Sequence, residues 1–365
     1  MHKTKEPLFH IVKRGEMPWY FSWCIRAASI ALALVCCGLI STMVTKDNPI
    51  QIFATIIDGS FGSSRKFMVL LQNTAMLLCV ALALTPAFKM RFWNIGGEGQ
   101  ALAGALAAAA CMILMKNQSN LIVIPCMVVT SISAGALWGA IPAFFKAKFG
   151  TNETLFTLMM NYVAIQLVAY FSVVWENPKG SGNIGVINPN TKVGWFPEIL
   201  GSKYALNILI VVLLTFAVYI YLNYTKHGYE ISVVGESERT ARYVGIKVEK
   251  VIIRTMLISG AICGLAGLLL VGGTNHTLNS SIVDGRGFTA VMVSWLGKFN
   301  PIWMVLTSFL LVFLSRGAGE IATDFGLNAS YGDILTGIIL FFIIGCEFFI
   351  NYKISLTKSS KKEEK

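Results

Sequence analysis

The chain has 365 residues, of which 55% are hydrophobic and only 13% are charged. A typical soluble protein has about 25% charged residues, so this chain has too few to cover a soluble surface. The net charge of +11 lies in short breaks between apolar runs, which is how membrane proteins set their orientation. The composition therefore excludes a soluble enzyme, a disordered protein and a nucleic-acid-binding domain, and it indicates a polytopic membrane protein.

Apolar runs divide the chain into candidate membrane spans, each of which needs about 20 mainly apolar residues. The first run is not followed by a small-residue cleavage pattern, which predicts an uncleaved helix rather than a signal peptide. Nine runs qualify as spans: 27–44, 67–88, 95–115, 121–145, 155–175, 206–222, 251–273, 301–315 and 333–350. A tenth run, 288–297, is short and bounded by glycine, which predicts either a half-helix or a tilted span.

The basic residues favour ten spans with both ends of the chain in the cytoplasm. On that topology the inside segments hold 21 of the 30 Lys and Arg residues, as the positive-inside rule requires. The long segment 176–205 is then outside, and the strongly charged segment 224–250 is inside.

The sequence gives no reason to expect catalysis or a metal centre. It contains no phosphate-binding GxxxxGK[ST] loop and no GxSxG, HExxH or complete GxGxxG motif. The eight cysteines lie in or beside apolar runs without metal-ligand spacing, and the four histidines are scattered. We therefore expect no enzyme activity and no cofactor on this chain, so that transport and structural roles remain.

Polar residues enter the apolar runs at two places. The stretch NIGGEGQ at 94–100 puts Glu98 at the mouth of a predicted membrane helix, where it either caps the interface or lies near a translocation path. Further along, Glu153, Thr157 and Asn161 are spaced four apart and share one helix face. Such a stripe faces protein or water, so it either bonds to a neighbouring helix or lines a pore.

Glycines mark two further segments. Gly260 and Gly264 form a GxxxG pattern, followed by Gly267, which favours close helix packing over substrate contact. The block 287–301 is a short helix bounded by glycine and proline. Broken helices at membrane depth often mark gates or binding sites, although a tilted short span has the same pattern.

The charged inside segment contains GESERTARYVGI at 235–246. The pattern predicts a short helix over 236–245, with Glu238 and Arg242 one turn apart and Gly245 ending the helix. Small residues and an aromatic beside a terminating glycine are what a docking helix would have, whereas a lone charged loop is usually only solvated.

At these residues the sequence resembles the permease subunits of bacterial ABC importers for simple sugars and nucleosides, the ribose-type permease superfamily. The resemblance runs from about residue 59 to about 350 and includes GSFGS at 59–63, NIGGEGQ at 94–100, the NE…LMxNY stretch at 152–162, the cytoplasmic segment with its SGxxxGLAG helix, and the block 287–301. The chain departs from the family at Thr240-Ala241-Arg242, where small residues are usual. NIGGEGQ and the extra N-terminal span are most similar to the longer permease of nucleoside systems.

The resemblance implies an all-α bundle of about ten transmembrane helices, some short or broken, like that of a type II importer. Its divisions would be a cytoplasmic segment 1–26, a permease domain 27–351 with a coupling segment 224–250, and a disordered cytoplasmic tail 352–365. It also implies a multi-pass protein of the bacterial cytoplasmic membrane that works with an ABC ATPase, a second permease and a substrate-binding lipoprotein. The second permease is expected to be a different, shorter paralogue, and ATP and Mg would bind only to the ATPase.

The family pattern assigns roles to the residues above. Those expected to couple to the ATPase are Gly235, Glu238, Arg239, Ala241, Arg242, Tyr243 and Gly245. Candidates for the translocation path or its gate are Asn94, Glu98, Gln100, Asn152, Glu153, Thr157, Asn161 and Phe288. Gly260, Gly264 and Gly267 are expected to pack helices.

The substrate expected from the resemblance is a nucleoside, with a simple sugar as the alternative. A secondary transporter is the rival class, but it would carry buried carboxylates in mid-helix for its coupling ion. Here Arg26, Glu98, Asp333 and Glu347 all lie near the predicted helix ends.

Overall fold

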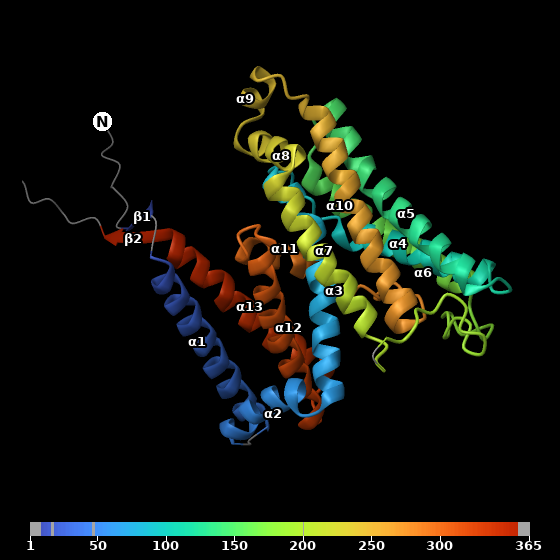
Figure 1. Cartoon of the computed structure of the whole chain (residues 1–365). Helices are drawn as coiled ribbons and strands as arrows, with labels where there is room; N and C mark the ends of the chain where they lie inside the picture. Colours follow the sequence, from blue (N-terminus) through green and yellow to red (C-terminus); the bar gives the residue numbers. More distant parts are fainter. Residues whose placement is uncertain (1–8, 16–17, 46–47, 200, 357–365) are drawn as a thin grey trace, which may run out of the picture. The chain divides into compact units, whose positions relative to one another are not determined.

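The computed structural model describes residues 9–15, 18–45, 48–199 and 201–356. Within this part the chain forms thirteen α-helices, one π-helical turn and a two-stranded antiparallel sheet (Figure 1). The all-α class predicted from the sequence is confirmed.

Nine helices of the described part are long and apolar enough to cross a membrane. Each corresponds to one of the nine predicted runs. They are α1 (Trp19–Thr45), α3 (Ser64–Lys89), α4 (Gly97–Leu114), α5 (Asn120–Phe149), α6 (Glu153–Val174), α7 (Ala205–Tyr224), α10 (Val248–Leu270), α12 (Pro301–Asp324) and α13 (Ala329–Asn351).

The tenth predicted span is a half-helix. It forms α11 (Arg286–Leu296), whose 11 residues rise only about 16 Å, roughly half the hydrocarbon thickness of a bilayer. A second short helix, α2 (Pro49–Phe61), was not predicted, because its 13 residues are too few for a span. Asn48 caps α2 by accepting a hydrogen bond from the Ile50 amide, and Pro49 occupies its first turn.

The chain divides into two compact units, residues 1–63 with 313–365 and residues 64–312. In the first, α1 and α13 run antiparallel and are joined by polar side chains. Arg26 Nε donates to Glu347 Oε1 at 2.8 Å, and the Tyr331 hydroxyl bonds to Ser41 at 3.0 Å.

Strands β1 (Phe9–Lys13) and β2 (Tyr352–Leu356) pair antiparallel and join the two ends of the described chain. Two boundaries predicted from the sequence differ from the bounds of these elements. Helix α1 already begins at Trp19, within the predicted segment 1–26, and residues 352–356 form a strand where we expected the disordered tail to start. The rest of that tail, 357–365, lies outside the described residues.

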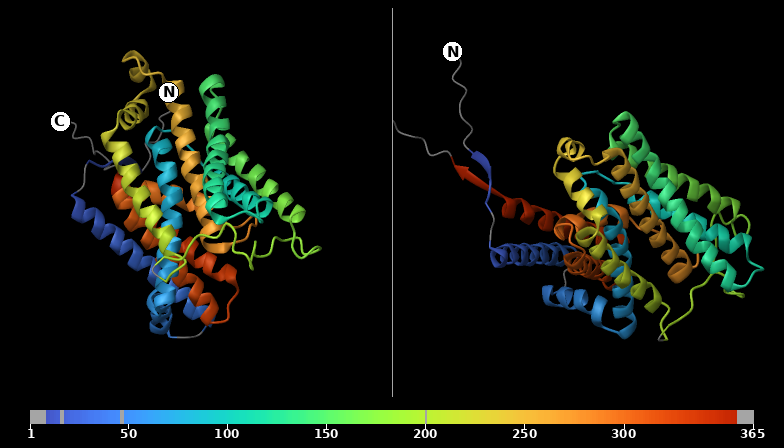
Figure 2. Two further views of the ribbon diagram at one scale, coloured as in Figure 1. Left: turned by 45° about the vertical axis from the view of Figure 1, so that its right-hand side comes forward. Right: turned by 45° about the horizontal axis from the view of Figure 1, so that its top comes forward.

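In the second unit α10 is the central helix and packs against α3, α4 and α5. It continues into a π-helical turn, η1 (Val271–Asn275). Helices α8 (Lys226–Glu236) and α9 (Glu238–Tyr243) lie at one end of α7 and α10, and the 175–204 loop lies at the other (Figures 1 and 2). The unit thus has two distinct ends, which the sequence predicted to face opposite sides of the membrane.

Candidate functional site

A buried hydrogen-bond network surrounds the 94–100 loop, which leads from α3 into α4. Asn94 is fully buried and donates to Ser259 of α10 at 3.1 Å, and Gln100 donates to Asn94 Oδ1 at 3.1 Å. The network ties the loop to the central helix through side chains that are distant in sequence. Ser259 belongs to the glycine-rich stretch, but its bond to Asn94 was not foreseen, because no spacing rule links the two positions.

The polar stripe of α6 holds the same loop. Thr157 Oγ1 accepts a hydrogen bond from the Ile95 amide at 3.2 Å. Asn161 accepts from the Gly99 amide at 2.8 Å and donates to the Ile95 carbonyl at 2.9 Å. Of the two interpretations left open by the sequence, this geometry favours bonding to neighbouring protein over the lining of a pore.

Two other predicted path residues, at the start of α6, make different contacts. Glu153 forms an ion pair with Lys146 of α5, with Oε2 and Nζ 2.7 Å apart. Asn152 caps the start of α6 by accepting a hydrogen bond from the Leu155 amide at 3.2 Å. These two residues therefore stabilise the turn between α5 and α6.

Glu98 caps the half-helix α11. Its carboxylate accepts hydrogen bonds from the amides of Gly285 at 3.0 Å and Gly287 at 2.7 Å, and the residue is only 5% exposed. The first amides of a helix carry partial positive charge, so a buried carboxylate is stabilised there. Two motifs that the sequence treats separately thus form one joint between α4 and α11. Phe288 follows this joint with 44% of its surface exposed.

Backbone contacts replace side-chain packing along α10. A Cβ added to Gly260 would come closer than 3.0 Å to the Gly135 carbonyl oxygen of α5. A Cβ added to Gly264 would come equally close to the Ser131 carbonyl oxygen of the same helix. At Gly267 it would meet the Ala101 carbonyl of α4 equally closely. All three predicted packing glycines therefore lie at helix crossings.

The partner positions on α5 were missed, although the sequence carries a signal for them. Ser131, Gly135 and Gly139 are spaced four apart, which is the same small-residue pattern seen on α10. A search for facing small-residue stripes would have paired α5 with α10.

The segment 224–250, which the sequence predicts to be inside, contains two short helices, α8 and α9. The predicted helix over 236–245 instead begins at Glu238, because Ser237 is extended and accepts a hydrogen bond from the Thr240 amide at 3.2 Å. Gly245 adopts φ +85°, the left-handed conformation predicted for the helix end. Tyr243 projects from α9 with 92% of its surface exposed.

Two contacts anchor α8 to the membrane helices. A Cβ on Gly235 would overlap the Lys89 carbonyl at the end of α3. Arg254 of α10 forms an ion pair with Glu230 of α8 at 2.8 Å. The segment therefore bears directly on α3 and α10, the two most buried spans of the described part. Glu230 and Arg254 were not predicted, since residues 24 apart on different helices show no spacing signal.

The remaining predicted coupling residues divide between the two faces of α9. Arg242 pairs with Glu249 of α10 at 3.0 Å, a contact made across the turn rather than along the predicted helix. Ala241 is fully buried, whereas Glu238 and Arg239 are exposed.

At the opposite end, the 175–204 loop is fastened to the end of α10. The Phe196 amide donates to Gly272 at 2.9 Å, and the Ile187 amide donates to His276 at 2.7 Å. The rings of Trp195 and His276 stack with centroids 3.8 Å apart. Burial and the nearby Lys203 lower the pKa of His276 to about 4, so this ring is neutral at pH 7.

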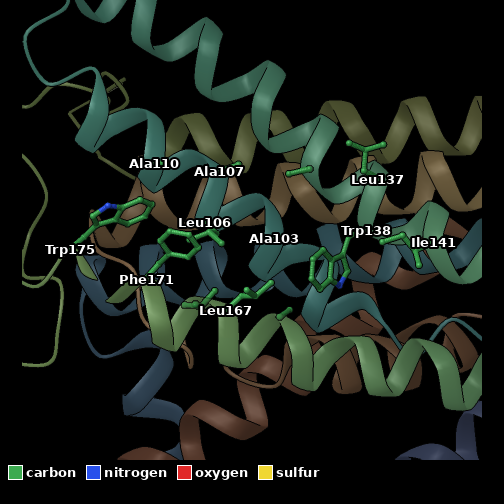
Figure 3. Close-up of a pocket in the computed structure, with 13 residues that line it drawn as sticks. Ala103, Leu106, Ala107, Ala110, Leu137, Trp138, Ile141, Leu167, Phe171 and Trp175 are labelled. Atoms are coloured by element: carbon green, nitrogen blue, oxygen red, sulfur yellow. The ribbon is translucent and has the colours of Figure 1, made fainter. Parts of the chain in front are cut away.

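Helices α4, α5 and α6 enclose an apolar groove of about 490 Å³ (Figure 3). Trp138 and Trp175 stand at its two ends, with Ala103, Leu106 and Phe171 between them (Figure 3). Only the two indole N–H groups among its lining side chains are polar, so the groove suits an acyl chain or an apolar helix rather than a polar solute.

Comparison with known proteins identifies the class. The family model for the permease component of the branched-chain amino acid transport system matches residues 67–344. The chain belongs to this family of ABC transporter permeases and is a multi-pass membrane protein.

Three relatives are similar over most of their length. The nucleoside ABC transporter permease protein NupB of Lactococcus lactis is 27% identical, over 90% of this chain and 92% of its own. The guanosine ABC transporter permease protein NupP of Bacillus subtilis is 30% identical, over 80% of this chain and 84% of its own. The glucose ABC transporter permease protein TsgB13 of Haloferax volcanii is 25% identical, over 89% and 88%.

Proposed function

We propose that this permease forms the translocation path for a nucleoside in an ATP-driven importer. The observation that carries the proposal is the similarity to two permeases named for nucleosides and guanosine, at 27% and 30% identity over most of both chains. A simple sugar is the alternative, which the similarity to a glucose permease supports at 25% identity.

Uptake by the assembled transporter tests the substrate. The permease would be reconstituted in proteoliposomes with its ATPase, its second permease and its receptor, and supplied with labelled uridine, guanosine, glucose or leucine. We expect ATP-dependent uptake of the nucleosides. Uptake of glucose alone would establish the sugar alternative, and uptake of leucine alone would contradict both.

The mechanism we infer is alternating access driven by the partner ATPase. A receptor delivers substrate to the end of the permease that carries the 175–204 loop, and the ATPase binds at the end that carries α8 and α9. Closure of the ATPase would press on α9, and the contacts of α8 and α9 with α3 and α10 would carry that movement into the bundle. Glu98 would then transmit it from α4 to α11 through its two amide bonds.

We infer that Tyr243 is the main contact with the ATPase. Its side chain is 92% exposed at the tip of α9. Aromatic side chains that become buried when a partner binds often dominate the binding energy of an interface. Tyr243→Ala should uncouple substrate uptake from ATP hydrolysis while receptor binding on the other face persists.

A matched control is Tyr162→Ala, which removes an exposed tyrosine from α6 and should leave both rates unchanged. Wild-type uptake and ATPase rates in Tyr243→Ala combined with Gly245→Val would show that the segment is an ordinary solvated loop. The contact would then have to lie elsewhere, and the α5–α6 turn near residues 146–150 is the next candidate.

We also propose that both ends of the chain are cytoplasmic. The pairing of β1 with β2 supports a common side for the two ends, and the antiparallel α1 and α13 lead away from that side together. A common side requires an even number of crossings, so beside the nine long helices we infer a tenth, made by the half-helix α11 together with the segment 276–285 that leads into it. Reporter fusions after Lys116 and after Lys192 should read as outside, and a cytoplasmic reading at either site would exclude this topology.

A further inference from the structure

A polar cavity of about 250 Å³ lies between α3, η1 and the start of α11. Its lining is rich in amides and hydroxyls, in contrast to the apolar groove of Figure 3. The residues that carry the argument are Gln72, Thr274, Asn279, Ser281, Asp284 and Arg286. The cavity is at the same end of the unit as the 175–204 loop, because η1 continues directly into His276, which bonds to that loop.

One acceptor at the floor of the cavity has no partner in the described part of the chain. Gln72 is only 2% exposed, and its Oε1 has no hydrogen-bond partner among the described residues. A buried amide oxygen left without a partner costs about 1–3 kcal/mol, so its position calls for a ligand or a water molecule.

Beside this acceptor the floor presents one donor. Thr274 Oγ1 accepts hydrogen bonds from Gln72 Nε2 at 2.7 Å and from Asn207 Nδ2 at 3.0 Å. A hydroxyl oxygen has two acceptor positions, so both are used and the hydroxyl hydrogen remains to be donated. The π-helical turn places Thr274 here, and π-helical turns are frequent at functional sites.

Together the floor matches a hydroxyl group, which donates to Gln72 Oε1 while it accepts from Thr274. The rim favours a neutral ligand, because the Arg286 guanidinium lies 3.9 Å from the Asp284 carboxylate and their charges offset each other. No aromatic ring lines the cavity within the described residues, so there is no platform on which a base could stack. The volume is also below the roughly 300–1,000 Å³ of typical small-molecule pockets, which limits the occupant to about one ring.

We propose that this cavity binds a neutral, hydroxyl-bearing sugar ring, either as the ribose of a nucleoside or as a free sugar, on its way into the translocation path. The inference rests on the proposed function and adds the part of the substrate that the permease itself reads. Gln72 and Thr274 bind one ring hydroxyl, and the exposed side chains of Asn279 and Ser281 form the entrance.

Protection of an engineered cysteine measures binding directly. Ser281→Cys at the rim would be labelled by a membrane-impermeant thiol reagent in the assembled transporter, with the wild-type protein as background for its eight native cysteines. Millimolar uridine should slow the labelling about threefold, as expected when about two-thirds of the sites are occupied, and 2′,3′-dideoxyuridine and leucine should not. Gln118→Cys, in the turn between α4 and α5, is the control that no solute should protect.

The pattern of protection identifies the source of the ring. Slower labelling with both uridine and free ribose, or with either one alone, supports the proposal and names the source. Equal protection by uridine and dideoxyuridine, or no protection by uridine or ribose, overturns it. Because this assay measures binding, it can fail while the complex still imports nucleosides, which separates this inference from the proposed function.

A second variant tests the floor. Gln72→Leu removes the acceptor, and a site built to bond a hydroxyl loses much of its affinity without that group. We expect nucleoside uptake to fall about tenfold and the substrate to protect the engineered cysteine no longer, while the complex still assembles. Gln166→Leu makes the same change at an exposed position on α6 and should have no effect. Unchanged uptake and protection in Gln72→Leu would overturn the assignment of the floor.

Discussion

The α10 crossings and the α1–α13 pair use different means to hold membrane helices together. In α10, 72% of the span is buried, and glycines bring its backbone against the carbonyls of α4 and α5. In α1 and α13 the buried share is 22% and 28%, and long polar side chains bridge the helices. Lipid gives helices no hydrophobic reason to associate, so association must come from close packing or from polar contacts. Backbone contact at a glycine leaves no space for added atoms, whereas long polar side chains can adjust their conformation.

The largest expected effect is at the glycine crossings. Gly264→Leu would push a side chain into the Ser131 carbonyl, and a backbone cannot move aside as a side chain can. The cost should exceed the roughly 1–3 kcal/mol of ordinary overpacking, so that the detergent-stable complex is lost, as size-exclusion chromatography would show.

The same substitution in α13 is the control. A Cβ at Gly337 has no heavy atom within 4 Å, so Gly337→Leu should leave the yield of the complex near that of the wild type. Equal yields from the two variants would show that the difference between the two regions is not one of backbone contact.

A smaller effect is expected at the 94–100 loop. Asn161→Leu would leave the Gly99 amide and the Ile95 carbonyl without their side-chain partner. We expect the free energy of unfolding in detergent to fall by about 2 kcal/mol, because each unpaired buried group costs roughly 1–3 kcal/mol and some of this is recovered through other partners. Asn223→Leu, at an exposed position on α7, should change it little. A loss of unfolding free energy no greater than that of Asn223→Leu would show that the stripe does not stabilise the fold.

The smallest effect is expected in the α1–α13 pair. Arg26 and Glu347 are partly exposed, with 15% and 23% of their side-chain surfaces accessible, so their ion pair is partly screened. A double-mutant cycle with Arg26→Met and Glu347→Gln should give a coupling energy of about 1 kcal/mol in thermal unfolding. A coupling of several kcal/mol would mean that this pair is as rigid as the α10 crossings.

The positions of the long helices followed from the sequence, because a span must be apolar throughout and its length is set by the bilayer. Every one of the nine predicted runs became a long helix, and most ends moved by only a few residues. The short helices were harder to predict. Helix α2 was missed, and 288–297 could be read in two ways, because half a span leaves no length signal.

The candidate site was only partly predictable. The sequence located Glu98, Asn161 and Gly245, since polar groups and glycines inside apolar or charged runs are conspicuous. It could not show that Glu98 caps α11, 187 residues away, or that Gln72 and Thr274 share a cavity. Such pairs are joined only by the crossing of helices.

What the sequence by itself determined was the class of protein, its spans and the positions where polarity or glycine interrupts them. These depend on the transfer of side chains into lipid, a property of each segment alone. Only the tertiary structure decided what those interruptions do. It turned the stripe of α6 into support for a loop, made a carboxylate the cap of a half-helix, and left one amide oxygen of Gln72 unpaired in a polar cavity. Hydrogen bonds between helices depend on which faces meet, and no single segment carries that information.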